Sequence, residues 1–146
     1  MVEISKREAV IELVNRLFIF TDDRAWDKLL GEVFADEVLF DMSSAGGASP
    51  GRMKSSEICR MWKEGFVGID SIHHQAGNYI VAIVDGVSAE VFCYATATHF
   101  KKSATKGNVR EFVGSYNLMA VFTDVGWRIS AFKYNLKYVA GNSSLE

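Results

Sequence analysis

The sequence changes its periodicity at Ser71, and this change restricts the fold more than any other feature of the chain. Before Ser71, apolar residues recur three or four positions apart, which is the spacing of one face of an α-helix. The first such face is expected to contain Val10, Leu13, Val14, Leu17, Phe18 and Thr21. After Ser71, apolar side chains alternate with others, as they do along a β-strand. Helices followed by antiparallel strands predict an α+β fold, with three N-terminal helices packed on one sheet face.

Capping residues predict where the helices begin. Ser5 and Glu8 have the spacing of a capping box, so the first helix should begin there. Asp22 or Asp23 can cap a second, short helix. Ser56 can cap a third helix. The inner side of this third helix is expected to carry Ile58, Met61, Trp62 and Phe66.

Strands and turns account for most of the remaining chain. EVLFDM predicts a short strand, in which Asp41 is out of phase with the apolar residues and is interpreted as structural. SSAGGASPGRMKSS contains the only proline and three glycines, so it is predicted to be a loop. IHHQAGNYIVAIVDGVSAEVFCYATATHF predicts two strands joined by a tight turn at Asp85-Gly86. A second strand pair, REFVGSYNLMAVF and WRISAFKYNLKYV, meets across TDVG.

One strand face combines small side chains with a histidine. Alternation places Cys93, Ala95, Ala97 and His99 together and turns the intervening residues to the other face. A row of small residues that ends in a polar ring leaves space beside that ring. The sequence therefore predicts a pocket on this face, in which Cys93 is a small wall residue and not a nucleophile.

Composition excludes several classes of protein. A chain of 146 residues with 49% hydrophobic and 23% charged residues predicts one globular domain, residues 1–146. A net charge of −2 without a basic stripe argues against nucleic-acid binding, and no apolar run reaches the ~20 residues of a membrane span. Cys59 and Cys93 make no disulfide framework, and the N-terminus lacks a secretory pattern, so we expect a cytoplasmic protein. The terminal SSLE resembles a cloning scar, so Leu145 and Glu146 are left out of the fold prediction.

Several motifs together carry a family resemblance. FADEVLFD, HHQAGN, AEVFCYATATHF, GSY and DVGWRI, in this order and spacing, resemble the SnoaL-like branch of the nuclear-transport-factor-2-like superfamily. The resemblance covers roughly residues 5 to 142. It implies a cone-shaped α+β barrel, in which a strongly bent antiparallel sheet wraps around the helices and leaves a pocket between them.

The resemblance also implies a candidate catalytic pair. Scytalone dehydratase and hexachlorocyclohexane dehydrochlorinase, two members of the superfamily, orient a histidine base with an aspartate four residues before a tryptophan. That spacing is matched here by Asp22 and Trp26, and the corresponding histidine is His74. His99 stands where the dehydratase has a second pocket histidine.

Two positions depart from the dehydratase pattern. Its tyrosine just before the aspartate is Thr21 here, and its tyrosine at the end of the first strand is Met42. Both departures remove phenols that position water in the dehydratase.

The implied residues form a chemically consistent set. A neutral histidine can accept a proton near neutral pH, because its unperturbed pKa is ~6.5. A carboxylate bonded to one ring nitrogen fixes the tautomer, and a second histidine or a phenol can donate a proton or stabilise an enolate. Asp22, His74, His99 and Tyr116 can fill these roles with neither metal nor organic cofactor. The predicted ligand contacts are Phe18, Thr21, Met42, Trp62, Ala95, Ala97 and Leu118.

Structural alternatives exist for each of these residues. Adjacent strand residues point to opposite faces, so only one of His73 and His74 can face the pocket, and we predict His74. His74 can equally be a buried structural histidine, Asp22 a helix cap, and Tyr116 a filler of the pocket.

Two functions therefore remain. The first is a cofactor-independent lyase or isomerase that acts on a small hydrophobic ligand, including a cyclic one. The alternative is a non-catalytic binding module or a structural subunit of the same fold. In either case we expect a homodimer through the outer sheet face, where Phe92, Tyr94, Thr96 and Thr98 lie.

Overall fold

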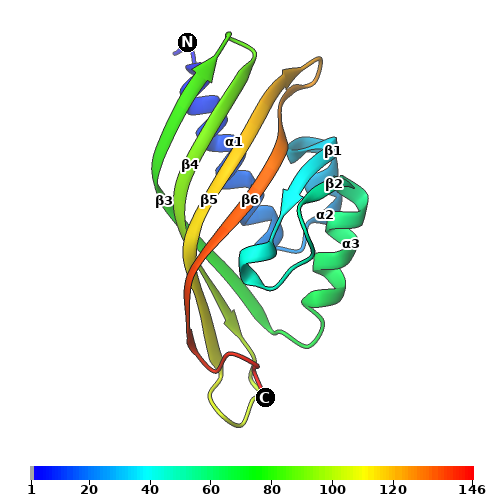
Figure 1. The fold of residues 1–146 in the computed structure, drawn as a ribbon, viewed down its shortest axis with the longest axis vertical. Coiled ribbons are helices and arrows are strands. Elements are labelled where there is room, and N and C mark those ends of the chain that lie inside the picture. Colours follow the sequence, from blue (N-terminus) through cyan, green and yellow to red (C-terminus); the bar gives the residue numbers. More distant parts are fainter. Residues whose placement is uncertain (1) are drawn as a thin grey trace.

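The computed structural model describes residues 2–146 and contains three α-helices and one six-stranded sheet (Figure 1). The helices are α1 (Lys6–Asp22), α2 (Trp26–Lys28), which continues into a π-helical turn (Leu29–Val33), and α3 (Ser55–Gly65). The strands are β1 (Phe34–Asp41), β2 (Gly51–Lys54), β3 (Ser71–Val84), β4 (Ser88–Phe100), β5 (Val109–Thr123) and β6 (Gly126–Gly141). Their order in the sheet is β2-β1-β6-β5-β4-β3. The predicted α+β architecture is confirmed, with the helices packed against the sheet.

The sheet is mixed and open, whereas the sequence predicted antiparallel strands throughout. All neighbouring strands pair antiparallel except β1 and β6, which run parallel and pair Leu39 with Ala131. Strands joined by a short turn are necessarily antiparallel. β1 meets β6 without such a connection, so no turn sets its direction.

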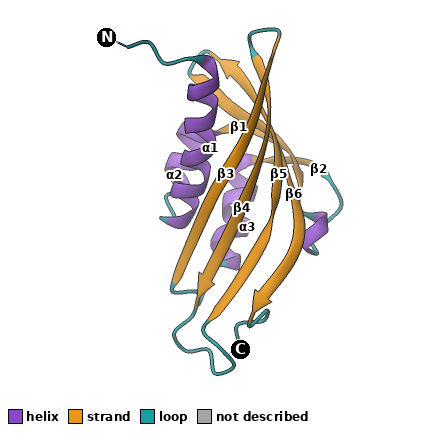
Figure 2. Cartoon of the chain, turned by 90° about the vertical axis from the view of Figure 1, so that its left-hand side faces the viewer, coloured by secondary structure: helices purple, strands orange, loops and turns teal. Residues whose placement is uncertain are grey.

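The two long hairpins agree with the predicted turns. β3 and β4 join through Asp85, Gly86 and Val87, and the first two have the positive φ (49° and 80°) that tight hairpin turns use. A register shift between Gly77 and Ile80 in β3 marks a bulge, and bulges bend strands. Figure 2 shows the result, a twisted and curved sheet with α1 lying along β3.

Helix α1 begins and packs as predicted. The Ser5 side chain accepts a hydrogen bond from the Glu8 amide, and the Glu8 carboxylate accepts one from the Ser5 amide. The buried face of the helix consists of Val10, Leu13, Val14, Leu17, Phe18 and Thr21. These side chains form one hydrophobic core with the inner face of the sheet.

The predicted caps of the other two helices are wrong. α2 follows Ala25 without a side-chain cap, and Asp23 is instead the C-cap residue that follows α1. The Asp22 carboxylate instead accepts a hydrogen bond from the backbone N–H of His74, 52 positions away. α3 includes Ser55 and Ser56 in its first turn and has no side-chain cap. Met61, predicted to face inward, is 41% exposed.

The two cysteines are free and buried. Burial raises the pKa of the Cys59 thiol to about 11 and that of Cys93 to about 12, so both remain protonated and unreactive at neutral pH. Among residues 2–146, no helix is long and apolar enough to cross a bilayer.

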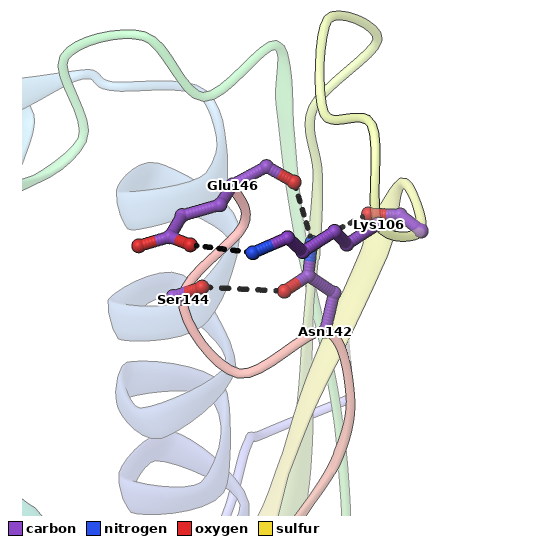
Figure 3. A network of polar contacts seen from close by, with 5 residues as sticks. Lys106, Asn142, Ser144 and Glu146 are labelled. Carbon is purple, nitrogen blue, oxygen red and sulfur yellow. Dashed lines mark hydrogen bonds and ion pairs between the residues drawn. The ribbon is translucent and has the colours of Figure 1, made fainter.

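The last two residues take part in the fold, so leaving them out of the prediction was wrong. Leu145 is 2% exposed and packs with Ile69 and Ile72. The Glu146 carbonyl accepts hydrogen bonds from the backbone amides of Thr105 and Lys106, both at 3.0 Å. Figure 3 shows two further contacts of Glu146, an ion pair with Lys106 and a bond from the Asn142 side chain to the Glu146 carbonyl. The C-terminal segment is thereby held against the loop between β4 and β5.

Candidate active site

A cavity of about 230 Å³ lies between α1, α3 and the inner face of the sheet. Aromatic and aliphatic side chains make up most of its wall, and two histidines and two tyrosines interrupt them. The wall consists of Leu17, Phe18, Thr21, Met42, Ala45, Trp62, Phe66, His74, Ala97, His99, Phe112, Tyr116, Phe132 and Tyr134. A mostly apolar cavity with a few converging polar groups is typical of a small-molecule site.

Most of the predicted contact residues lie on this wall, but three small or apolar residues do not. Ala95 and Leu118 are buried in the core away from the cavity, and Cys93 is fully buried beside them. Strand alternation predicts which residues lie on the inner face of the sheet, but it does not predict how far along the strand the cavity extends. Trp26, the fourth residue after Asp22, stacks on Phe66 at 6.2 Å and contacts the cavity only through that ring.

Asp22 and His74 form a close pair at one side of the cavity. Asp22 ends α1, and its Oδ1 lies 2.5 Å from Nδ1 of His74. The other carboxylate oxygen, Oδ2, accepts the backbone N–H of His74 at 2.8 Å. Both side chains are largely buried, and the Phe18 ring stacks on the His74 ring at 5.2 Å. Because a carboxylate only accepts, the Nδ1 position carries the proton and Nε2 of the neutral ring is a free acceptor.

His73 points the other way and is exposed, as strand alternation predicted. The two adjacent histidines therefore divide between solvent and cavity. Only His74 can reach a bound molecule.

His99 has a hydrogen-bond donor as its partner, whereas His74 has an acceptor. It is 7% exposed, and Nε of Arg110 donates a hydrogen bond to its Nδ1 at 3.0 Å. A guanidinium only donates, so Nδ1 of His99 is bare and the neutral ring carries its proton on Nε2. Burial, with a smaller contribution from the positive charge of Arg110, lowers the pKa of His99 to about 4. The ring is therefore a neutral hydrogen-bond donor at physiological pH.

Two tyrosines complete the polar part of the wall. Tyr116 packs edge-on against Phe18 at 5.1 Å and against Tyr134 at 4.8 Å. Burial raises the pKa of both phenols, so both stay neutral. The Tyr134 hydroxyl is buried and has no hydrogen-bond partner among residues 2–146. The hydroxyl occupies the space that a side chain at position 114 would fill, because it lies 2.7 Å from where a Cβ of Gly114 would be.

Tyr134 was missed in the sequence because its place opposite Tyr116 depends on a register shift in the hairpin. Tyr134 pairs directly with Tyr116 across β5 and β6, and paired residues share one face of a sheet. The turn at residues 124 and 125, where Thr123 pairs with Gly126, would by itself pair Tyr116 with Lys133. A register shift between Met119 and Ala120 moves the pairing by one residue, so counting from the turn does not lead to Tyr134.

Replacing Tyr134 by phenylalanine is expected to leave the free energy of unfolding unchanged or to raise it by up to ~1 kcal/mol. No internal hydrogen bond is lost, and a buried polar atom without a partner is removed. Urea denaturation measures this. The matched control is Tyr79→Phe, which removes a hydroxyl bonded to Asn15 and should cost ~1 kcal/mol. A clear loss of stability in Tyr134→Phe would contradict the assignment of an unpaired hydroxyl.

Thr21 and Met42 both line the cavity but supply no hydrogen-bond donor to it. The Thr21 hydroxyl donates to the Leu17 carbonyl at 2.6 Å, within α1. The thioether of Met42 is a weak acceptor and cannot donate. The polar rings on the cavity wall are thus those of the two histidines and the two tyrosines.

No three histidine, cysteine or carboxylate side chains of residues 2–146 come together in a way that could hold a metal ion. Asp41 stands apart from the cavity and accepts two hydrogen bonds from Ser43, through its amide and its hydroxyl. These bonds hold the pKa of the Asp41 carboxyl below its usual value. Asp41 therefore has the structural position expected from its phase in the strand.

Comparison with known proteins gives one family and a group of similar structures. A sequence profile described as a SnoaL-like domain matches residues 2–133. No curated protein sequence matches the chain. The solved structure of the Kfla4162 protein from Kribbella flavida is 27% identical, with 95% of each chain covered and a TM-score of 0.89.

Two further structures share the fold at lower identity. A scytalone dehydratase-like protein from Novosphingobium aromaticivorans is 12% identical, covering 94% of this chain and 87% of its own, with a TM-score of 0.80. A hexachlorocyclohexane dehydrochlorinase is 13% identical, covering 94% of this chain and 88% of its own, with a TM-score of 0.77. At these identities the likeness concerns the fold alone.

Proposed function

The chain belongs to the SnoaL-like domain family, and on this premise we propose that it is a cofactor-independent lyase or isomerase. The family and the cone-shaped α+β fold of the nuclear-transport-factor-2-like superfamily agree with the resemblance seen in the sequence motifs. Fold alone does not determine an activity, so the proposal depends on the cavity.

The observation that carries the proposal is that the two cavity histidines have partners of opposite kind, a carboxylate at Nδ1 of His74 and a guanidinium at Nδ1 of His99. His74 has its proton directed at Asp22 and offers a bare Nε2, whereas His99 has a bare Nδ1 facing Arg110 and offers Nε2–H. One ring is therefore a proton acceptor and the other a neutral donor. A neutral imidazole can polarise a carbonyl oxygen while a separate base removes a proton.

In the proposed reaction, His74 Nε2 takes a proton from the carbon next to a carbonyl group. The electron pair moves to the carbonyl oxygen, and the resulting enolate is stabilised by the hydrogen bond from His99 Nε2–H. In an elimination, the enolate then expels a hydroxyl group from the neighbouring carbon. That group leaves as water with the proton held on His74. In an isomerisation, the same proton returns to a different carbon.

Cavity size and wall chemistry support a small hydrophobic substrate. The volume of about 230 Å³ exceeds the roughly 150 Å³ of an engineered apolar cavity that binds benzene. One substituted ring or a small fused ring system therefore fits. Phe18, Trp62 and Phe132 supply flat apolar surfaces around it.

Proton exchange in heavy water tests the proposal and does not require an identified substrate. The protein is incubated in D₂O with a panel of small cyclic ketones and β-hydroxyketones, and deuterium uptake and loss of water are followed by mass spectrometry. Wild-type protein and His73→Ala should accelerate exchange of at least one compound, and His74→Ala should not. His73→Ala is the matched control because its side chain is exposed.

A non-catalytic binding module is the second candidate. Neither Thr21 nor Met42 offers a free hydroxyl to the cavity. This favours a binding module, because a dehydratase-like reaction benefits from groups that position water. Binding of panel compounds by the wild type and by His74→Ala with equal affinity, and with no exchange by either, would select this second function.

We also propose that two copies associate through the outer face of the sheet. Ile80, Tyr94 and Met119 are 67%, 43% and 40% exposed on this face. A groove of about 400 Å³ beside them is lined by Glu90 and Lys133, which supply opposite charges to the same surface. A two-fold interface requires a surface that complements itself, and this one has both apolar area and charges of opposite sign.

The expected result is a dimer at micromolar concentrations in multi-angle light scattering. Ile80→Glu places a charge on the apolar face and should shift the protein toward monomer. A wild-type protein that is monomeric across this concentration range would refute the association.

A further inference from the structure

Arg110 is outside the set of residues that the sequence assigned to the site, yet it contacts that site directly. His99 and Arg110 are paired across β4 and β5, so their side chains leave the sheet on the same face. Nε of Arg110 lies 3.0 Å from Nδ1 of His99. Arg110 is partly buried and does not line the cavity, so it reaches bound molecules only through His99.

Four further contacts hold the Arg110 and His99 side chains in place. Nη1 of Arg110 donates to the Ser143 carbonyl of the C-terminal segment at 3.2 Å. The guanidinium also lies over the Phe112 ring at 5.3 Å, and Phe112 packs against His99 at 5.4 Å. Phe66, just after α3, contacts the His99 ring at 5.8 Å. The guanidinium is therefore held by two neighbours besides His99, and its Nε–H is directed at that ring.

We propose that Arg110 is a positioning residue that keeps His99 in its Nε2–H tautomer, so that the ring presents a hydrogen-bond donor to the substrate. Without the arginine, a buried neutral histidine can place its proton on either nitrogen. A share of the molecules would then present a bare Nε2, which repels the oxygen of an enolate. The inference rests on the proposed function for its catalytic consequence, but the tautomer itself is a property of the free protein.

Two substitutions separate the hydrogen bond of Arg110 from its charge. In glutamine the amide nitrogen is bonded to Cδ, as Nε is in arginine, so Arg110→Gln keeps an N–H donor at the same reach without the charge. Arg110→Met has similar length and no donor. Arg128→Met is the matched control, because Arg128 bonds to the carbonyls of Trp127 and Gly31 and not to a histidine.

The tautomer is measured by long-range ¹H–¹⁵N NMR of the three histidine rings, which distinguishes a bare ring nitrogen from a protonated one. We expect His99 to carry its proton on Nε2 in the wild type, Arg110→Gln and Arg128→Met, and to populate the Nδ1–H tautomer in Arg110→Met. A wild-type His99 protonated on Nδ1 would overturn the inference, as would an unchanged tautomer in Arg110→Met. If Arg110→Met does not fold, Arg110→Leu, which also lacks a donor, takes its place in the same measurement.

Turnover of a compound found in the exchange assay gives the second readout. Arg110→Met should lower kcat by ~10- to 100-fold with little change in KM, less than the ~10²–10³ lost when an oxyanion donor is removed outright. Arg110→Gln should recover most of kcat. An Arg110→Gln variant as slow as Arg110→Met would show that the charge, and not the tautomer, is what matters. If no compound is turned over, the proposed function fails while the NMR result still confirms or rejects the role of Arg110.

Discussion

Replacing His74 by alanine is expected to lower turnover of a genuine substrate by ~10²–10⁴-fold, the usual contribution of a positioned proton acceptor. His74 is the one histidine whose cavity-facing nitrogen is bare, because its Nδ1–H is directed at Asp22. Loss of the ring removes the base and leaves the rest of the wall intact. Steady-state rates of deuterium exchange or elimination measure the effect. A rate within tenfold of the wild type would exclude His74 as the base.

Asp22→Asn should lose much of the same rate for a different reason. The carboxylate accepts two N–H groups, one from the His74 backbone and one from its ring. An amide oxygen can serve only one of them, and the amide nitrogen must then face the other. With the oxygen on the backbone N–H, the amide nitrogen donates to Nδ1 and drives the ring proton to Nε2. The base then has its proton on the wrong nitrogen, and the same rate measurement should show the loss.

His99 is expected to make the stability of the protein fall in mild acid. Burial, followed by the charge of Arg110 and the neighbouring His74, lowers the pKa of His99 to about 4, while Asp22 opposes this shift. In the unfolded chain the ring takes a proton below ~6.5. Between these two values the unfolded state binds more protons, so the free energy of unfolding decreases as the pH falls. The contribution of this one group is about 2–3 kcal/mol across the window.

The matched variant for this measurement is His99→Asn. The asparagine oxygen can accept the Arg110 Nε–H in place of Nδ1, and the side chain does not titrate. Urea denaturation between pH 7 and 4.5 should give a shallower loss of stability in the variant than in the wild type. The other titratable groups contribute equally to the pH dependence of stability in both proteins. Parallel curves would mean that His99 titrates normally in the folded state.

Periodicity predicted the parts of the site that depend on a single element. The helix face of α1 and the inner face of β4 followed from spacing alone, and alternation separated His74 from His73. These features depend on local backbone geometry, which is regular in long helices and strands.

Features that depend on contacts between distant elements did not follow from periodicity. Asp22 has the sequence of a helix cap, and its pairing with His74, 52 residues away, was expected only from the family resemblance. Arg110 pairs with His99 across strands joined by a loop of eight residues between Phe100 and Val109, and a loop of that length does not set the register. The positions of both side chains are decided by tertiary packing.

The bond from the His74 backbone to Asp22 has a consequence for how related sequences diverge. One oxygen of Asp22 fastens the end of α1 to β3 whatever residue stands at position 74, because it binds the main chain. A relative that has lost its chemistry would still lose stability on losing this aspartate. We therefore expect inactive relatives to keep the aspartate and to replace the histidine by other residues. Retention of the histidine, and not of the aspartate, is the better marker of an active member.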